Sequence, residues 1–101
     1  GMVISNEPGY YERNWGGIRL ENLYVVKKVD GLQEHPGGKG WLGFETLTLV
    51  PFERRLIERS LLSSEEIKWL DEYHIRVLGE ISPMIENSED LQWLNWACGF
   101  N

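Results

Sequence analysis

The chain has 101 residues, of which 42% are hydrophobic, and its 16 acidic and 10 basic residues give a net charge of -6. This length suits one small domain, and the apolar content is enough for a packed core. The acidic balance excludes nucleic acid and an anionic membrane as expected partners, because both require a positive surface.

The single cysteine, Cys98, excludes an intramolecular disulfide or a cysteine zinc cluster and fits a reducing, cytoplasmic location. No apolar run approaches the roughly 20 residues that a membrane-spanning helix needs. Residues 1–7 lack the basic and apolar regions of a signal peptide. They open directly into a strand-like run, as expected for a piece of a longer protein.

The first half of the sequence has strand-like patterns. Residues 2–5 form a short apolar run that ends at the turn signal Asn6-Glu7-Pro8-Gly9. After a loop that closes at Trp15-Gly16-Gly17, residues 18–26 alternate as a second, longer strand. Residues 27–40 are polar and glycine-rich, which predicts an irregular connection, and residues 44–50 predict a third strand that stops at Pro51.

The second half has helical signals, whereas residues 52–62 have no clear period. Ser63 and Glu66 form a capping box, and Pro83 should end or kink the helix that follows. A second helix is expected to begin near Asn87. The predicted buried stripes are Ile67, Leu70, His74, Val77, Leu78 and Ile81 in the first helix, and Leu91, Leu94 and Cys98 in the second. Strands followed by helices predict an α+β fold.

Two carboxylates are expected to face each other. If the strands around the first turn pair as an antiparallel hairpin centred on Asn14, Glu7 lies opposite Glu21, with Cβ atoms about 5 Å apart. Like charges at that distance are destabilising unless a shared proton, a basic neighbour or a metal ion compensates them. Arg19, on the same face as Glu21, could supply part of the compensation, so a solvated hairpin with a salt bridge is the alternative.

The motifs resemble the Xaa-Pro aminopeptidase (aminopeptidase P) family of pita-bread metallopeptidases. They are Asn6 to Tyr11 (NEPGYY), Gly17 to Asn22 (GIRLEN), Gly43 to Pro51 (GFETLTLVP) and the stretch from Leu61-Leu62 through Trp69-Leu70 to Tyr73-His74. The resemblance implies antiparallel strands of the C-terminal part of the pita-bread fold in residues 1–51. Residues 52–101 would be the C-terminal helical extension.

The resemblance also implies the roles of four residues. Glu7 would bind one metal and manage the proton of the nucleophilic water, Glu21 would bridge two metals, and Tyr11 and Arg19 would support the site. The cofactors would be two divalent ions, with manganese expected and zinc or cobalt as alternatives. The two aspartates and the histidine that complete the family's ligand set lie upstream of these motifs. The chain alone is therefore expected to be inactive and to hold no metal tightly.

The implied activity is hydrolysis of the bond between an N-terminal residue and a following proline, in a homo-oligomer. One alternative is a non-catalytic pita-bread-like module that binds peptide or protein. The other is creatine- or methionine-directed chemistry on the same fold, which the long extension after Pro51 disfavours.

Several other polar or aromatic residues are expected to be structural. His35 is expected to be a solvated loop residue, His74 a packing residue and Cys98 unreactive. Most of the five tryptophans are expected in the core, with Trp15 at the hairpin tip as the exception. Glu45 lies in a family motif but has no role that the sequence explains.

Overall fold

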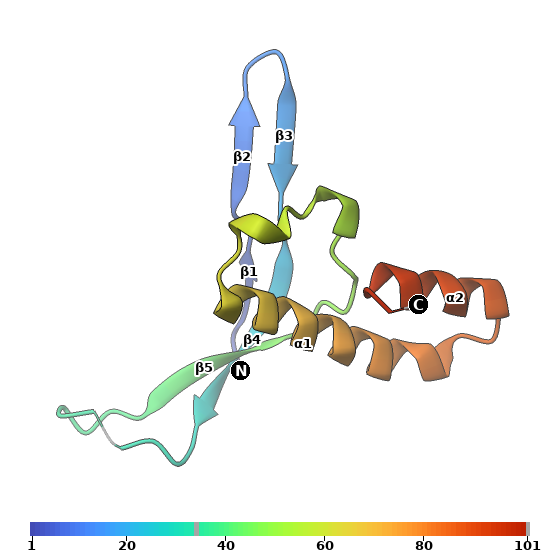
Figure 1. The fold of residues 1–101 in the computed structure, drawn as a ribbon. Coiled ribbons are helices and arrows are strands. Elements are labelled where there is room, and N and C mark those ends of the chain that lie inside the picture. Colours follow the sequence, from blue (N-terminus) through green and yellow to red (C-terminus); the bar gives the residue numbers. More distant parts are fainter. Residues whose placement is uncertain (34, 101) are drawn as a thin grey trace. The chain divides into compact units, whose positions relative to one another are not determined.

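The structure is a computed structural model that describes residues 1–33 and 35–100. It divides into two compact units, Gly1–Thr48 and the residues from Leu49 onward. The first unit consists of strands and the second of helices, so the expected α+β class is confirmed (Figure 1). The assignment of residues 1–51 and 52–101 to a catalytic domain and its extension stays a prediction.

The first unit contains two antiparallel ladders. Strands β1 (Val3–Asn6), β4 (Asn22–Val29) and β5 (Trp41–Thr46) form a sheet in the order β1-β4-β5. Strands β2 (Gly9–Glu12) and β3 (Gly16–Arg19) form a two-stranded hairpin. The hairpin continues the β1–β4 ribbon, as Figure 1 shows.

The predicted strand over residues 18–26 is interrupted, because Leu20 and Glu21 belong to neither β3 nor β4. The interruption lies opposite Pro8, which has no backbone N–H to donate to a ladder. Pro8 still accepts a hydrogen bond from the Leu20 amide at 2.9 Å. The chain therefore keeps its pairing across the gap while regular strand geometry is lost.

Other strand boundaries also differ from the prediction. The loop expected between Asn6 and Trp15 contains β2, and the third strand begins earlier and ends earlier than residues 44–50. Strand β4 extends through Lys27, Lys28 and Val29, which were expected in the irregular connection. The reason is their pairing with β5, because the ladder runs on until Val29 meets Trp41.

The second unit contains helices α1 (Ser64–Ile81) and α2 (Ser88–Ala97). The predicted capping box is present, since the Glu66 amide donates to Ser63 Oγ at 3.2 Å and the Ser63 amide donates to Glu66 Oε2 at 2.8 Å. Asn87 caps α2, as expected. Helix α1 ends before Pro83, which lies in the 3₁₀ helix η3 (Ser82–Met84).

Residues 52–62, which show no clear period in the sequence, contain two more 3₁₀ helices, η1 (Arg54–Leu56) and η2 (Arg59–Leu61). Each is capped by the side chain of the glutamate that precedes it. Single turns of this kind show no hydrophobic periodicity, which explains why no pattern was visible.

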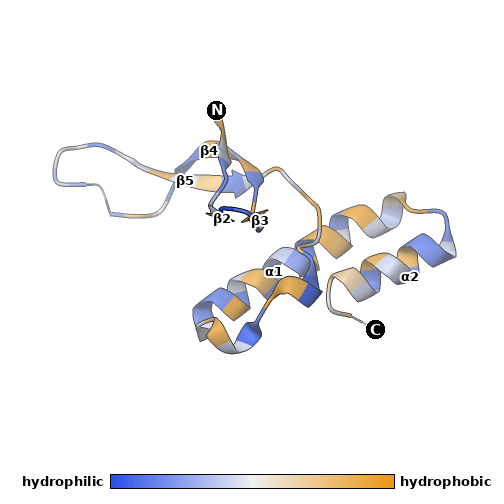
Figure 2. Ribbon diagram, turned by 90° about the horizontal axis from the view of Figure 1, so that it is seen from above, coloured by the Kyte–Doolittle hydropathy of each residue, from blue (hydrophilic) through white to orange (hydrophobic). Residues whose placement is uncertain are grey.

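The core of the second unit lies between α1 and α2. Its buried members are Tyr73 and Val77 from α1, Leu94 from α2 and Cys98 just beyond it. Figure 2 shows hydrophobic residues interspersed along both helices. Phe52 packs against this cluster, and the Tyr73 hydroxyl donates to the carbonyl of Val50 at 2.8 Å. These contacts attach the segment before α1 to the helix.

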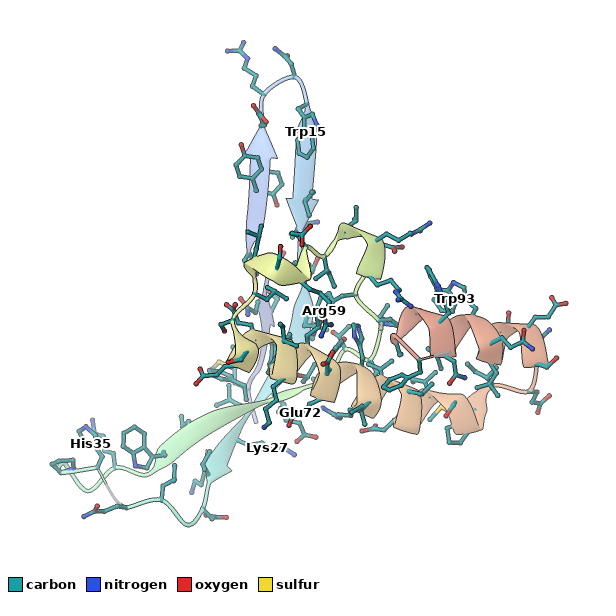
Figure 3. All side chains as sticks on the ribbon, viewed as in Figure 1. Trp15, Lys27, His35, Arg59, Glu72 and Trp93 are labelled. Atoms are coloured by element: carbon teal, nitrogen blue, oxygen red, sulfur yellow. The ribbon has the colours of Figure 1, made fainter. Side chains whose placement is uncertain are left out.

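The prediction that most tryptophans lie in the core is wrong, because even Trp96 is 38% exposed and the other four are more so. Two of them, Trp15 and Trp93, are labelled in Figure 3. Some indoles contact their neighbours at the surface instead, since Trp69 stacks on Tyr73 and Trp96 lies beneath the guanidinium of Arg54. The small core of the helical unit leaves its own three indoles, Trp69, Trp93 and Trp96, partly exposed.

Within the described residues, neither helix combines the length and the apolar character needed to cross a bilayer.

Candidate metal centre

The structure aligns the two carboxylates that the sequence placed opposite each other. Asn6 pairs with Asn22 in the β1–β4 ladder, and Gly9 pairs with Arg19 in the β2–β3 ladder. The same register holds on both sides of the interruption, so Glu7 and Glu21 occupy facing positions within it. The predicted hairpin register is therefore confirmed by the pairs that flank these two residues.

Arg19 lies beside this pair and partly neutralises it. Its Nε is 3.4 Å from Glu21 Oε2, and both side chains are about half exposed, at 52% and 47%. The pKa of Arg19 is raised above its usual value, first by a hydrogen bond with the Tyr11 side chain and by attraction to Tyr11, then by the charges of Glu21 and Glu7. The four residues singled out from the sequence thus share one electrostatic environment.

The Tyr11 ring is held by two glycines that lie beneath it. A Cβ on Gly17, the cross-strand partner of Tyr11, would lie 2.3 Å from Tyr11 Cδ1, and a Cβ on Gly9 would lie 2.7 Å from the Tyr11 hydroxyl oxygen. Any side chain at either position would displace the ring. The two glycines therefore let the ring lie along the hairpin, with its hydroxyl over the residue that pairs with Arg19.

The tip of the hairpin is a tight turn. Asn14 has a φ of 64° and Gly16 a φ of 137°, and the Trp15 amide donates to the carbonyl of Glu12 at 3.2 Å. Asparagine and glycine tolerate this left-handed region better than other residues. The exposed Trp15 indole lies near this end of the hairpin (Figure 3).

Glu7 has a hydrogen-bond donor of its own. The hydroxyl of Ser5 donates to Glu7 Oε1 at 2.5 Å. The sequence did not single out Ser5, although a hydroxyl two residues before the carboxylate was visible as a signal. The supporting glycines at positions 9 and 17 were likewise missed, although the assumed register already placed Gly17 opposite Tyr11.

The remaining candidate residues lie elsewhere. His74 is buried and accepts a hydrogen bond from the Phe52 amide at 3.1 Å, and burial lowers its pKa, as expected of a packing histidine. His35 lies in the exposed loop, where its ring meets that of Trp41 edge-on, and Figure 3 labels it there. Burial raises the pKa of the Cys98 thiol, which disfavours the reactive thiolate.

Glu45 has a partner that the sequence did not reveal. Its carboxylate forms an ion pair with Lys27 on the neighbouring strand. The two residues are diagonal neighbours, because Lys27 pairs with Gly43 and Glu45 pairs with Val25. Cross-strand partners of this kind contribute to the pairing of β4 with β5.

A metal ion would find a suitable but partial set of donors in the candidate site. Glu7 and Glu21 supply carboxylate oxygens, which hard divalent cations prefer. Residues 1–33 and 35–100 contain no group of three or more histidine, cysteine, aspartate or glutamate side chains placed to hold a metal. The two carboxylates therefore fit part of a metal site.

Comparison with protein-family models assigns both parts of the chain. Residues 40–99 match the C-terminal region of peptidase M24, and residues 1–28 match metallopeptidase family M24. Similar proteins include a probable Xaa-Pro aminopeptidase P of Coprinopsis cinerea, 47% identical over 93% of this chain. Aminopeptidase P2 of Arabidopsis thaliana is 46% identical over 93% of this chain. The chain spans 15% and 13% of these relatives' lengths.

A solved structure also resembles this one. The X-prolyl aminopeptidase of Caenorhabditis elegans, described as a cytosolic enzyme with a di-nuclear active site, has a TM-score of 0.76 and 38% sequence identity. The match covers 95% of this chain and 16% of that protein. The resemblance seen in the sequence motifs is confirmed by these matches. The chain belongs to metallopeptidase family M24, and most of its length forms the C-terminal region of that family's peptidases.

Proposed function

We propose that this chain is the carboxyl-terminal part of the active site of an Xaa-Pro aminopeptidase, within a longer polypeptide. The observation that carries the proposal is the single register across the Pro8–Leu20 gap, which places Glu7 opposite Glu21 with Arg19 and Tyr11 beside them. Two facing carboxylates are unfavourable without compensation, and one arginine compensates part of their charge. A metal centre accounts for the rest.

In this proposal Glu7 would hold one of two divalent ions and manage the proton of the nucleophilic water, and Glu21 would help to hold both ions. Arg19 and Tyr11 orient and neutralise Glu21 without binding metal. When bound, the pair of ions supplies an activated water and polarises the scissile carbonyl. We propose manganese as the metal, with zinc or cobalt as alternatives, and peptides with proline in the second position as substrates.

The longer polypeptide would supply the remaining ligands. This chain matches only 15% of the length of the Coprinopsis cinerea relative, so in that relative most of the sequence lies outside the matched part and could carry the remaining ligands. Asn22, the residue after Glu21, gives independent support. It is buried, and its amide Nδ2 has no hydrogen-bond partner among the described residues. A buried unpaired donor is costly, which favours an acceptor from the rest of the polypeptide.

The working protein is proposed to be cytoplasmic and homo-oligomeric. The description of the Caenorhabditis elegans relative as cytosolic supports the first point. For the second, strands β1 and β5 each pair only with β4 among the described residues, so each leaves one edge of the sheet unpaired. Unpaired edges and the exposed apolar side chains of Met2, Leu42 and Phe44 both favour association.

The decisive experiment is Glu21→Ala in the full-length protein. We expect hydrolysis of an Xaa-Pro peptide to be lost while thermal unfolding stays close to wild type, because Glu21 is exposed and contributes to the metal site rather than to a core. Glu12→Ala, at the far end of the same hairpin, is the matched control and should retain activity. Normal turnover by metal-replete Glu21→Ala would contradict the proposal.

A further inference from the structure

The Glu7 carboxylate accepts a hydrogen bond from the hydroxyl of Ser5. Ser5 and Glu7 are two residues apart along an extended segment, so their side chains lie on the same face. Ser5 Oγ donates to Glu7 Oε1 at 2.5 Å, at the short end of the range for a hydroxyl that donates to an ionised carboxylate. An ionised carboxylate has no proton to donate, so the direction of this bond is fixed.

The two partners differ in how firmly the backbone holds them. Ser5 lies inside β1 and pairs with Leu23 of β4, so the ladder fixes its position. Glu7 lies beyond the end of β1, in the interruption between the two ladders. The hydrogen bond therefore ties a long, rotatable side chain to a point on a regular strand.

We propose that Ser5 is a positioning residue that orients the Glu7 carboxylate for metal binding. The bond engages Oε1 and leaves Oε2 available as a ligand. Because the side chain is ordered before the metal binds, less conformational entropy is lost on binding. This inference rests on the proposed function, since it assigns a partner to a residue that the proposal already places at the metal.

The test compares Ser5→Val with Ser5→Thr in the full-length protein. These side chains are nearly isosteric and both suit a strand, but threonine alone retains the hydroxyl. Metal-free protein is titrated with Mn²⁺ by calorimetry, and hydrolysis of an Xaa-Pro peptide is measured over a range of Mn²⁺ concentrations. We expect Ser5→Val to bind Mn²⁺ about 10- to 100-fold more weakly, the usual effect of losing such a partner. Ser5→Thr should stay near wild type.

The chain offers a matched control. The hydroxyl of Ser60 donates to Glu58 Oε1 at 2.6 Å, the same kind of bond over the same spacing in the helical unit. Ser60→Ala should leave Mn²⁺ affinity unchanged. Thermal unfolding of each metal-free variant distinguishes loss of positioning from loss of fold, and Ser5→Ala replaces Ser5→Val if valine unfolds the protein.

The outcomes separate this inference from the proposed function. If Glu7→Ala weakens Mn²⁺ binding and hydrolysis while Ser5→Val binds Mn²⁺ as tightly as Ser5→Thr, the role of Ser5 is overturned and the function stands. If Glu7→Ala changes neither property, the metal site is overturned and the role of Ser5 with it. Weaker binding by Ser5→Val alone among the serine variants supports the inference.

Discussion

Gly17→Ala is the substitution for which the structure gives the sharpest expectation. The new Cβ would lie 2.3 Å from Tyr11 Cδ1, 2.8 Å from Tyr11 Cε1 and 3.2 Å from the Tyr10 carbonyl oxygen. Carbon atoms in contact are normally about 3.5–4.0 Å apart, so the ring must move by more than about 1 Å. A shift of that size removes the Tyr11 hydroxyl from its place beside Arg19.

The cost to stability is expected to be small. The Tyr11 side chain is 64% exposed, so the ring can turn into solvent rather than compress its neighbours. Replacing a strand glycine with alanine also gains roughly 0.5–1 kcal/mol from the unfolded chain. We therefore expect a net change within about 1 kcal/mol in the free energy of unfolding.

The cost to activity is expected to be larger. Loss of a group that orients a metal ligand typically reduces activity by about 10- to 100-fold, and Tyr11 contacts the arginine that pairs with Glu21. The assay is kcat/KM of the full-length protein on an Xaa-Pro peptide, beside thermal unfolding. Gly40→Ala is the control, because no atom of the described residues would lie within 4 Å of its Cβ and its φ is not positive.

A double-mutant cycle with Tyr11→Ala tests the cause. If Gly17 acts through the ring, the two substitutions together should reduce activity little more than Tyr11→Ala alone. Wild-type activity in Gly17→Ala, or fully additive losses in the double variant, would refute the reasoning.

Three further predictions follow from other contacts. At saturating metal, Arg19→Ala should reduce activity by about 10- to 100-fold, which is a smaller loss than that of Glu21→Ala, because Arg19 binds no metal. Equal losses in the two variants would show that their roles are not distinct. Burial lowers the pKa of His74, so the unfolded chain gains a proton below about pH 6.5 that the folded chain resists. The free energy of unfolding of the isolated chain should therefore fall as the pH drops below that value, and His74→Gln should flatten this dependence in denaturant titrations. The isolated chain should self-associate, and light scattering that gives a mass near 11.8 kDa at high concentration would contradict this.

The sequence alone was sufficient for features determined by residues close together. The caps at Ser63 and Asn87 form as expected, because each bond joins groups two or three residues apart. The register that places Glu7 opposite Glu21 was also accessible, since one tight turn at Asn14 sets every pair along the ribbon. The resemblance to the family rests on motifs in these same segments.

The tertiary structure decided what depends on atoms from separate segments. The ion pair of Lys27 with Glu45 and the hydrogen bond that His74 accepts from the Phe52 amide both need contacts across many residues, and no local pattern encodes them. The exposure of Trp69, Trp93 and Trp96 followed from how little core two helices can enclose, which a count of aromatic residues does not reveal. The position of the Tyr11 ring over Gly9 and Gly17 likewise depends on the strand register together with the direction of the side chain. A glycine in the sequence indicates that space is needed at its position, but it does not show which atoms fill that space.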